Sequence, residues 1–121
     1  MAFAIASQAK DPGDPVYYDP RFRTVIESHL TILRNSPTTQ RQRISPDTIH
    51  RFEGDFYGLL IEMGVSFQFH WIFMRVNNLE SPNQFGAQLR DPYRDRYEFT
   101  LLIPSTEAMN DLRSLFLTTQ D

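Results

Sequence analysis

The side chains best suited to chemistry in this sequence are three histidines and one close pair of carboxylates. His29, His50 and His70 are widely separated, and no two have the i, i+4 spacing of a helical zinc site. Glu53 and Asp55 flank a glycine and could form the acid/base pair of a glycosidase, although such acids more often serve a turn and a helix cap. No hydrolase, phosphate-loop or dinucleotide motif is present. We therefore predict no catalytic residue, no metal and no cofactor.

The composition restricts the class of protein. A chain of 121 residues, 40% of them hydrophobic, suffices for one small domain with an arm. Fifteen acidic against twelve basic residues give a net charge of −3, which argues against a nucleic-acid partner. The absence of cysteine excludes a disulfide scaffold and a thiolate zinc site. No apolar run approaches the roughly 20 residues of a membrane span, and the first residues lack the basic start of a signal peptide. We expect a protein made in a cytoplasm, with no membrane partner.

The N-terminal part predicts an arm followed by one helix. Prolines and a glycine interrupt residues 1–20, which is typical of an extended segment. Its tyrosines would pack on the rest of the chain or on a partner, or else belong to a disordered tail. Asp19-Pro20 suits a helix start. Apolar residues then recur at three- and four-residue steps as far as Leu33, which predicts a helix of about four turns ending at Asn35-Ser36-Pro37.

A polar linker follows this helix and divides the chain. Residues 38–43 contain two arginines and few apolar side chains. We place the boundary at their end, so that residues 1–44 form the arm, helix and linker, and residues 45–121 form the central module with a C-terminal helix.

The central segment predicts a strand and two helices. Thr48–Phe52 can alternate inward and outward as a short strand does. Asp55 is placed to cap a helix with an apolar face, and Gly64 to end it. Residues 66–76 fit either a strand, by alternation and aromatic content, or a second helix. We favour the helix because the flanking motifs require one.

The last segment predicts a loop, a strand and a helix. Residues 81–96 are polar and rich in turn-forming residues, which indicates a surface loop. Residues 97–103 form the clearest strand pattern of the chain. Ser105 or Thr106 is placed to cap a final helix. The buried face of that helix is expected to comprise Met109, Leu112, Leu115 and Phe116. The predicted class is α+β with a two-stranded antiparallel sheet.

The order of these motifs resembles the LysM module. The motifs are Gly54-Asp55, Gly64-Val65-Ser66, Asn77-Asn78-Leu79 and Leu101-Leu102-Ile103-Pro104, and they span about residues 48–104. The resemblance implies a strand-helix-helix-strand fold that binds glycans, using the loop after the first strand and the segment after the second helix. The chain departs from the family in a longer spacing between Gly64 and Asn77, a charged insertion, and Glu98 in place of the usual glycine.

A second set of residues resembles the small baseplate wedge proteins of contractile-tailed phages, in which a helical arm precedes a LysM-like module. These residues are Asp19-Pro20-Arg21-Phe22-Arg23, Phe56-Tyr57-Gly58 and His70-Trp71-Ile72 before Val76-Asn77. The resemblance implies a virion protein located in the tail baseplate, made in the host cytoplasm, with other tail or baseplate proteins as partners in a hetero-oligomeric assembly.

The aromatic and basic residues outside the predicted module core are the candidates for partner contacts. Ten phenylalanines, five tyrosines and one tryptophan are many for a small core, and either the flanking helices bury the surplus or subunit contacts do. The surplus comprises Phe3, Tyr17, Tyr18, Phe85, Tyr93 and Phe116. The predicted partner-binding residues are Tyr17, Tyr18, Phe22, Arg41, Arg43, Arg90, Tyr93, Arg94 and Arg96.

Three functions follow from these observations, in order of preference. The first is a non-enzymatic structural subunit of a phage tail baseplate. The second is a glycan-binding LysM module that recognises peptidoglycan or chitin. The third is a wall-degrading enzyme, for which the sequence contains no catalytic constellation.

Overall fold

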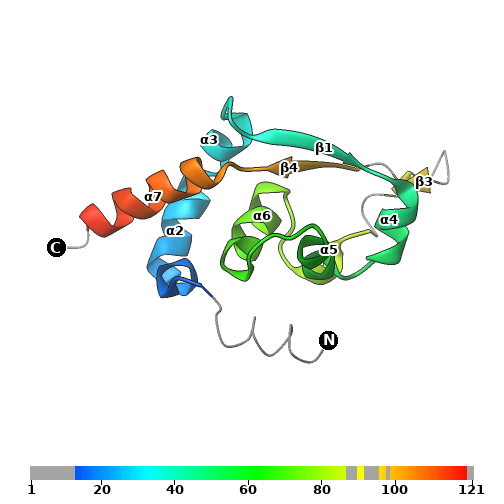
Figure 1. Ribbon diagram of the computed structural model, residues 1–121, viewed down its shortest axis with the longest axis horizontal. Coiled ribbons are helices and arrows are strands. Elements are labelled where there is room, and N and C mark those ends of the chain that lie inside the picture. Colours follow the sequence, from blue (N-terminus) through cyan, green and yellow to red (C-terminus); the bar gives the residue numbers. More distant parts are fainter. Residues whose placement is uncertain (1–12, 87–89, 92–95, 98, 120–121) are drawn as a thin grey trace.

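The computed structural model describes residues 13–86, 90–91, 96–97 and 99–119. The described part is a mixed α+β structure whose longest strands form a two-stranded antiparallel sheet (Figure 1). Its elements, in chain order, are η1 (Pro15–Tyr18), α2 (Pro20–Ser28), α3 (Leu30–Asn35), β1 (Gln40–Ile44), α4 (Pro46–Arg51), α5 (Phe56–Glu62), η2 (Phe67–Phe69), α6 (His70–Val76), η3 (Pro82–Gln84), β2 (Arg90–Asp91), β3 (Arg96–Tyr97), β4 (Phe99–Ile103) and α7 (Thr106–Thr118).

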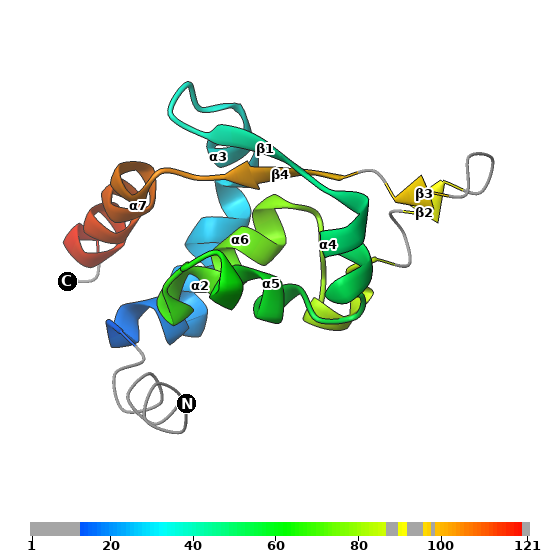
Figure 2. The same ribbon diagram turned by 45° about the vertical axis from the view of Figure 1, so that its right-hand side comes forward.

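The main sheet consists of β1 and β4, which lie side by side above α5 and α6 (Figures 1 and 2). In the antiparallel register, Gln40 lies opposite Ile103 and Ile44 lies opposite Phe99. A second pairing joins the short strands β2 and β3 beyond the end of the main sheet. The strand predicted over residues 97–103 is confirmed for β4.

The helix starts follow local capping signals. The side chains of Asp19, Asp55 and Ser105 each accept a hydrogen bond from a backbone N–H in the first turn of α2, α5 and α7. Gly64 follows α5 with a φ of +83°, where a residue without a Cβ is favoured. These predicted caps are confirmed.

The first strand of the sheet was placed wrongly by the sequence pattern. Residues 48–52, predicted as a strand, belong largely to α4, and the strand β1 lies earlier, in the predicted linker. Ser45 caps α4 by accepting a bond from the Thr48 N–H, and Pro46 occupies the first helical position. The predicted turn at these residues is therefore a helix start. The sequence pattern does not predict β1 as a strand, because four of its five residues are exposed and show no apolar alternation.

The predicted helix over residues 20–33 is interrupted. α2 ends at Ser28 and α3 begins at Leu30, with His29 between them at φ −117° and ψ 12°. The ring Nδ1 of His29 lies 2.7 Å from the Val25 carbonyl oxygen, so the side chain bonds to backbone at the break. The predicted end of the helical region at Asn35 is confirmed.

The helix favoured for residues 66–76 is confirmed from Phe67 onward. η2 leads directly into α6, and Ile72, Phe73, Met74 and Val76 are all buried. These residues surround the helix axis, so α6 is covered on nearly all sides and shows no single apolar face. Tertiary burial therefore outweighs the strand propensity of the aromatic and β-branched residues.

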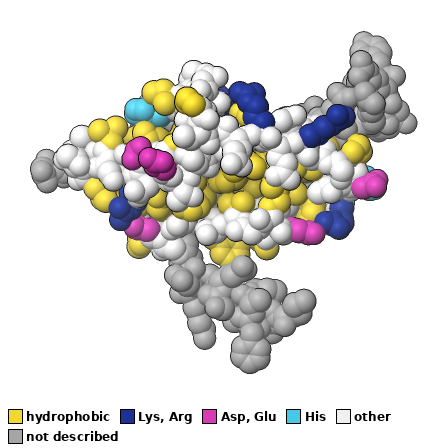
Figure 3. All heavy atoms as spheres, turned by 45° about the horizontal axis from the view of Figure 1, so that its top comes forward, with side chains coloured by type: hydrophobic (Ala, Val, Ile, Leu, Met, Phe, Trp, Pro, Cys, Tyr) yellow, Lys and Arg dark blue, Asp and Glu magenta, His cyan; other side chains and the backbone are white. Residues whose placement is uncertain are grey.

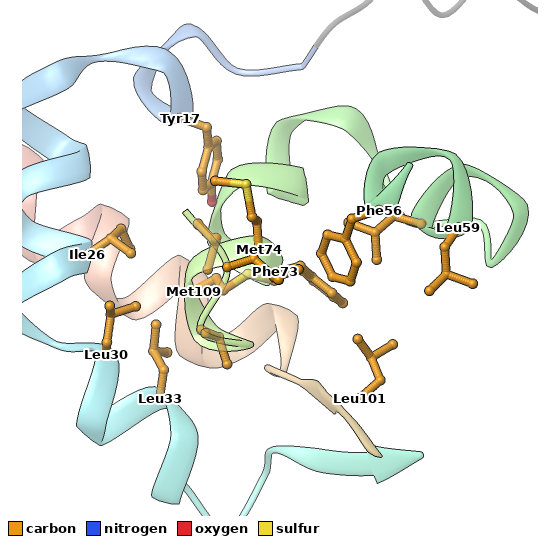
Figure 4. Packing of buried hydrophobic residues seen from close by; sticks show 14 of the residues in the cluster. Tyr17, Ile26, Leu30, Leu33, Phe56, Leu59, Phe73, Met74, Leu101 and Met109 are labelled. Atoms are coloured by element: carbon orange, nitrogen blue, oxygen red, sulfur yellow. The ribbon is translucent and has the colours of Figure 1, made fainter. Parts of the chain in front are cut away.

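One hydrophobic core joins the N-terminal helices to the central helices and the sheet. Figure 4 shows Phe73 and Met74 between Ile26 and Leu33 on one side and Phe56 on the other. The core cluster thus draws on residues both before and after the predicted boundary at residue 44. Most of the predicted face of α7 is buried within it, whereas Leu115 is 47% exposed.

Candidate docking surface

The residues considered for chemistry serve structural roles. Asp55 caps α5, with its Oδ1 3.0 Å from the Gly58 nitrogen, and the Glu53 carboxylate lies 3.6 Å from the ring of His50. Among the residues that the structure describes, no three histidines or carboxylates are grouped so that they could hold a metal ion. In the same part of the chain, no helix is both long and apolar enough to cross a bilayer.

His70 is a buried histidine with backbone and aromatic partners. Its Nε2 lies 2.9 Å from the Val65 carbonyl oxygen, and its ring lies 5.2 Å from the ring of Tyr57 and 5.1 Å from that of Phe67. Burial lowers the pKa of His70, because the charged imidazolium is disfavoured away from water, and the bond to Val65 opposes this shift. The neutral ring therefore fastens the start of α6 to the end of the preceding turn.

His70 predicts a loss of stability on mild acidification. Its folded-state pKa lies below the unfolded value of 6.5, so the unfolded chain binds more protons between these two values. The contribution of His70 is complete above the unfolded pKa and is lost as the pH falls through 6.5 toward the folded value. Urea unfolding across this range should show the decrease, and His70→Gln should reduce it. An equal decrease in both proteins would contradict the prediction.

Tyr17 and Phe22, predicted as partner contacts, are instead part of the core. Their exposed fractions are 6% and 1%, and their rings meet edge to face at 5.4 Å. Tyr17 also packs against Phe69 at 5.1 Å, and Phe22 against Phe116 at 5.3 Å. Intramolecular aromatic packing therefore accounts for these side chains, which corrects their assignment to a partner surface.

The structure describes the side chains of only some of the remaining candidates. Tyr18 is 41% exposed at the end of η1. Arg90 and Arg96 begin β2 and β3, where the structure describes only their backbone, and Tyr93 and Arg94 lie outside the described residues. Among the candidates whose side chains the structure describes, Arg41 and Arg43 lie two residues apart and exposed on the same strand, β1. These two arginines define the candidate surface.

Asn77 determines which edge of the sheet is open. Its side-chain amide donates to the Leu102 carbonyl at 3.0 Å and accepts from the Leu102 N–H at 2.8 Å, as a neighbouring strand would. The same amide nitrogen donates to the Phe73 carbonyl at 2.8 Å. Asn77 is buried, so α6 covers the edge of β4 opposite β1. The outer edge of the sheet is therefore that of β1.

A hollow of about 340 Å³ adjoins β1 on the side of α4 and α5. Ile44, Leu59 and Met63 supply its apolar lining, and Arg51 and Glu62 line it as an ion pair at 2.7 Å. Figure 3 shows basic side chains above a band of hydrophobic side chains on the face seen when the top of Figure 1 is turned forward. The surface thus combines a strand edge, positive charge and a partly apolar hollow. Sequence reasoning missed this hollow because its lining comes from β1, α4 and α5, which only the fold brings together.

A second hollow, of about 380 Å³, lies where the N-terminal segment meets α7. Arg113 donates two hydrogen bonds to Oδ2 of Asp14, at 2.9 and 2.6 Å, and the Asp14 N–H donates to Gln68 at 2.8 Å. The Val16 N–H and the Arg113 side chain lower the pKa of Asp14. Because its polar groups bond to one another, we interpret this site as a clamp that holds η1 in place.

Arg113→Ala is expected to loosen η1 without unfolding the protein. The pair is about one-third exposed, so its loss should cost only about 0.5–1 kcal/mol of global stability. The local effect should be larger: the amides of residues 16–18 should exchange faster in hydrogen–deuterium experiments. Arg51→Ala, which removes a distant ion pair, is the control and should leave this exchange unchanged. Equal exchange in the Arg113 variant and the parent protein would refute the clamp.

No family model, curated protein or solved structure matches this chain.

Proposed function

We propose that this chain is a non-enzymatic structural subunit of a phage tail baseplate, a wedge or adaptor that holds neighbouring virion proteins together. The observation that carries the proposal is the exposed arginine-bearing edge of β1, built on a well-packed core and adjoining a hollow. Such a surface suits protein docking, since arginine contributes strongly to protein interfaces. The sequence resemblance to baseplate wedge proteins supplies the biological setting.

The order of elements supports the LysM-like part of the proposal. A first strand and a last strand pair with each other, and α5 and α6 lie between them in the chain. Gly54-Asp55 precedes α5, Gly64 follows it, and Asn77 ends α6, in the order that the resemblance requires. The short helix α4 is an addition after the first strand.

The N-terminal helices support a rigid platform. Arg34 of α3 donates to the carbonyl oxygens of Arg75 and Val76, both at 2.9 Å, at the end of α6. Arg75 in turn forms an ion pair with Glu27 of α2 at 2.5 Å. These bonds join the helical segment to the central module, so we propose that the platform includes η1, α2 and α3, and that docking occurs on β1.

The proposal is tested on phage particles produced by the host that carries the gene. An antibody against the protein should label the distal end of purified tails in electron micrographs, and deletion of the gene should yield particles without complete baseplates. Complementation with Arg41→Glu/Arg43→Glu should restore assembly less well than complementation with the unaltered gene. Absence of the protein from purified particles would overturn the proposal.

A glycan-binding LysM module is the second candidate function. The hollow follows the first strand, at the loop where the resemblance places glycan binding, and the hydroxyl-bearing residues Ser45 and Thr48 contribute to its lining. Sedimentation with insoluble peptidoglycan and with chitin tests this candidate. Retention on either polymer, lost in Thr48→Arg, would favour glycan recognition over the structural role.

A further inference from the structure

We propose that β1 is a site of strand addition, where an extended acidic–apolar–acidic segment of a partner protein pairs with Arg41 and Arg43 and places its apolar side chain in the adjoining hollow. This inference rests on the proposed function, because the partner would be a neighbouring subunit of the same assembly.

The backbone of β1 presents free hydrogen-bonding groups on its outer side. In an antiparallel pair, the N–H and C=O of one residue point the same way, and successive residues alternate between the two sides. Since Leu102 directs both groups at Asn77, its register partner Arg41 directs both groups away from β4. Arg43, two residues on, does the same. Within the described residues, no backbone bond engages these groups, so they can pair with an added strand.

The position of the hollow determines the middle residue of the partner. Side chains of neighbouring strands at one level share a face of the sheet. Leu101, opposite Gln42, is fully buried, so Gln42 belongs to the inner face, and Gln42 also lines the hollow. A partner residue beside Gln42 would therefore point into the hollow, toward Leu59. An unbranched or γ-branched apolar side chain suits this partly apolar lining.

Charge determines the two flanking residues of the partner. Arg41 and Arg43 alternate with Gln42 along β1, so their side chains leave the strand on the other face, and Arg43 also contributes to the lining of the hollow. The ion pairs of the described residues include neither arginine. Acidic side chains at the first and third partner positions would lie beside them, where opposite charges on neighbouring strands are favourable. The observations thus specify a charge–apolar–charge alternation, matched to the period of a strand.

The same charges argue against a second copy of this chain as the occupant. Antiparallel pairing of two β1 strands about Gln42 would set Arg41 of each copy opposite Arg43 of the other. Like charges directly across strands are unfavourable, and arginine at an exposed edge opposes self-association. Charge repulsion therefore disfavours pairing of β1 with the β1 of a second copy, whereas an acidic strand can pair with it.

The test uses the peptide acetyl-Thr-Glu-Leu-Glu-Thr-amide and the full chain labelled with ¹⁵N. Titration should shift the amide signals of residues 40–44, with a Kd of about 1 mM, and should protect the Arg41 and Arg43 amides from exchange. Peptides with lysine in place of glutamate, or serine in place of leucine, should bind at least about tenfold more weakly.

Two variants distinguish the contribution of the β1 backbone to peptide binding from that of the arginine charge. Arg41→Pro removes an outward N–H without removing a bond to β4, so it should abolish binding and leave the fold intact. Arg41→Glu keeps the backbone and should weaken binding at least about tenfold, whereas the matched reversal Arg21→Glu on α2 should leave the Kd unchanged. If Arg41→Pro alters the fold, the Arg41→Glu and Arg21→Glu pair decides the result.

Every outcome bears on the inference. The inference is supported if peptide shifts the amide signals of β1 and of the residues that line the hollow, and if the variants change binding as stated. No shifts with about 10 mM peptide, or shifts elsewhere, overturn it. Shifts that depend on protein concentration without peptide would identify a second copy as the occupant and would also overturn it. Failure of peptide binding leaves the labelling of phage tails unaffected, so the inference and the proposed function fail separately.

Discussion

Replacing Phe85 by alanine is expected to lower the free energy of unfolding by about 3–5 kcal/mol. Phe85 is fully buried between Phe56 and Phe99, with ring centroids 5.3 and 5.4 Å away. Its removal would leave a cavity at the junction of α5, η3 and β4 and would break both aromatic contacts. Chemical denaturation monitored by circular dichroism measures the loss.

The neighbourhood of Phe85 prevents an easy collapse of that cavity. The Phe85 carbonyl accepts a bond from the Gly54 N–H at 2.7 Å, and Gly86 has a φ of +101° and lies where a Cβ would meet Glu53. Phe85→Leu, which fills much of the space, should lose less than about 1.5 kcal/mol. Leu117→Ala, at a position 45% exposed, should change stability by about 0.5 kcal/mol or less. A Phe85→Ala loss below that of Phe85→Leu would contradict this account.

Replacing Asn77 by alanine is expected to cost about 3 kcal/mol. The change would remove three hydrogen bonds and leave the N–H and C=O of Leu102 without partners at a half-buried edge, where each unpaired group costs at least about 1 kcal/mol. Asn77→Asp should be at least as harmful, because a buried carboxylate would face the carbonyl oxygens of Phe73 and Leu102. Thermal and urea unfolding of the purified variants measure both effects.

The adjacent asparagine is the matched control for this prediction. Asn78 is exposed and has a φ of 66°, a left-handed conformation that glycine adopts without strain. Asn78→Gly should therefore leave stability within about 0.5 kcal/mol of the parent protein. If Asn77→Ala lowered the free energy of unfolding no more than Asn78→Gly does, the bonds from the Asn77 amide to the edge of β4 would not be important for stability.

The α-helical starts were predictable because each is a local event. An aspartate or serine that accepts a bond from a backbone N–H two or three residues later needs no distant partner. The prediction at Ser45-Pro46 was wrong because this pair suits a turn as well as a helix start, so the local sequence does not distinguish the two. The helix is stabilised there by Ile49, which is fully buried in the hydrophobic core.

The candidate surface was predictable only in part. The sequence predicts Arg41 and Arg43 as partner-binding residues of a polar linker. The pairing of β1 with β4 instead places them on a strand at the edge of a sheet. Tyr17 and Phe22 are predicted as partner contacts, yet both are buried in the core that the N-terminal helices share with the rest of the fold. An aromatic side chain is equally suited to a core and to an interface, so composition cannot distinguish the two.

The amino-acid sequence is sufficient to predict the absence of cysteine chemistry, the α+β class, the last strand and the helix starts at Asp19, Asp55 and Ser105. These properties depend on composition, on alternation and on contacts within a few residues. The polar segment of residues 40–44 is a strand because of long-range pairing: its partner lies about sixty residues later, and backbone pairing leaves no side-chain pattern. Asn77 occupies the edge of β4 that faces away from β1, so the unpaired edge of this sheet, and with it the proposed docking site, is that of β1.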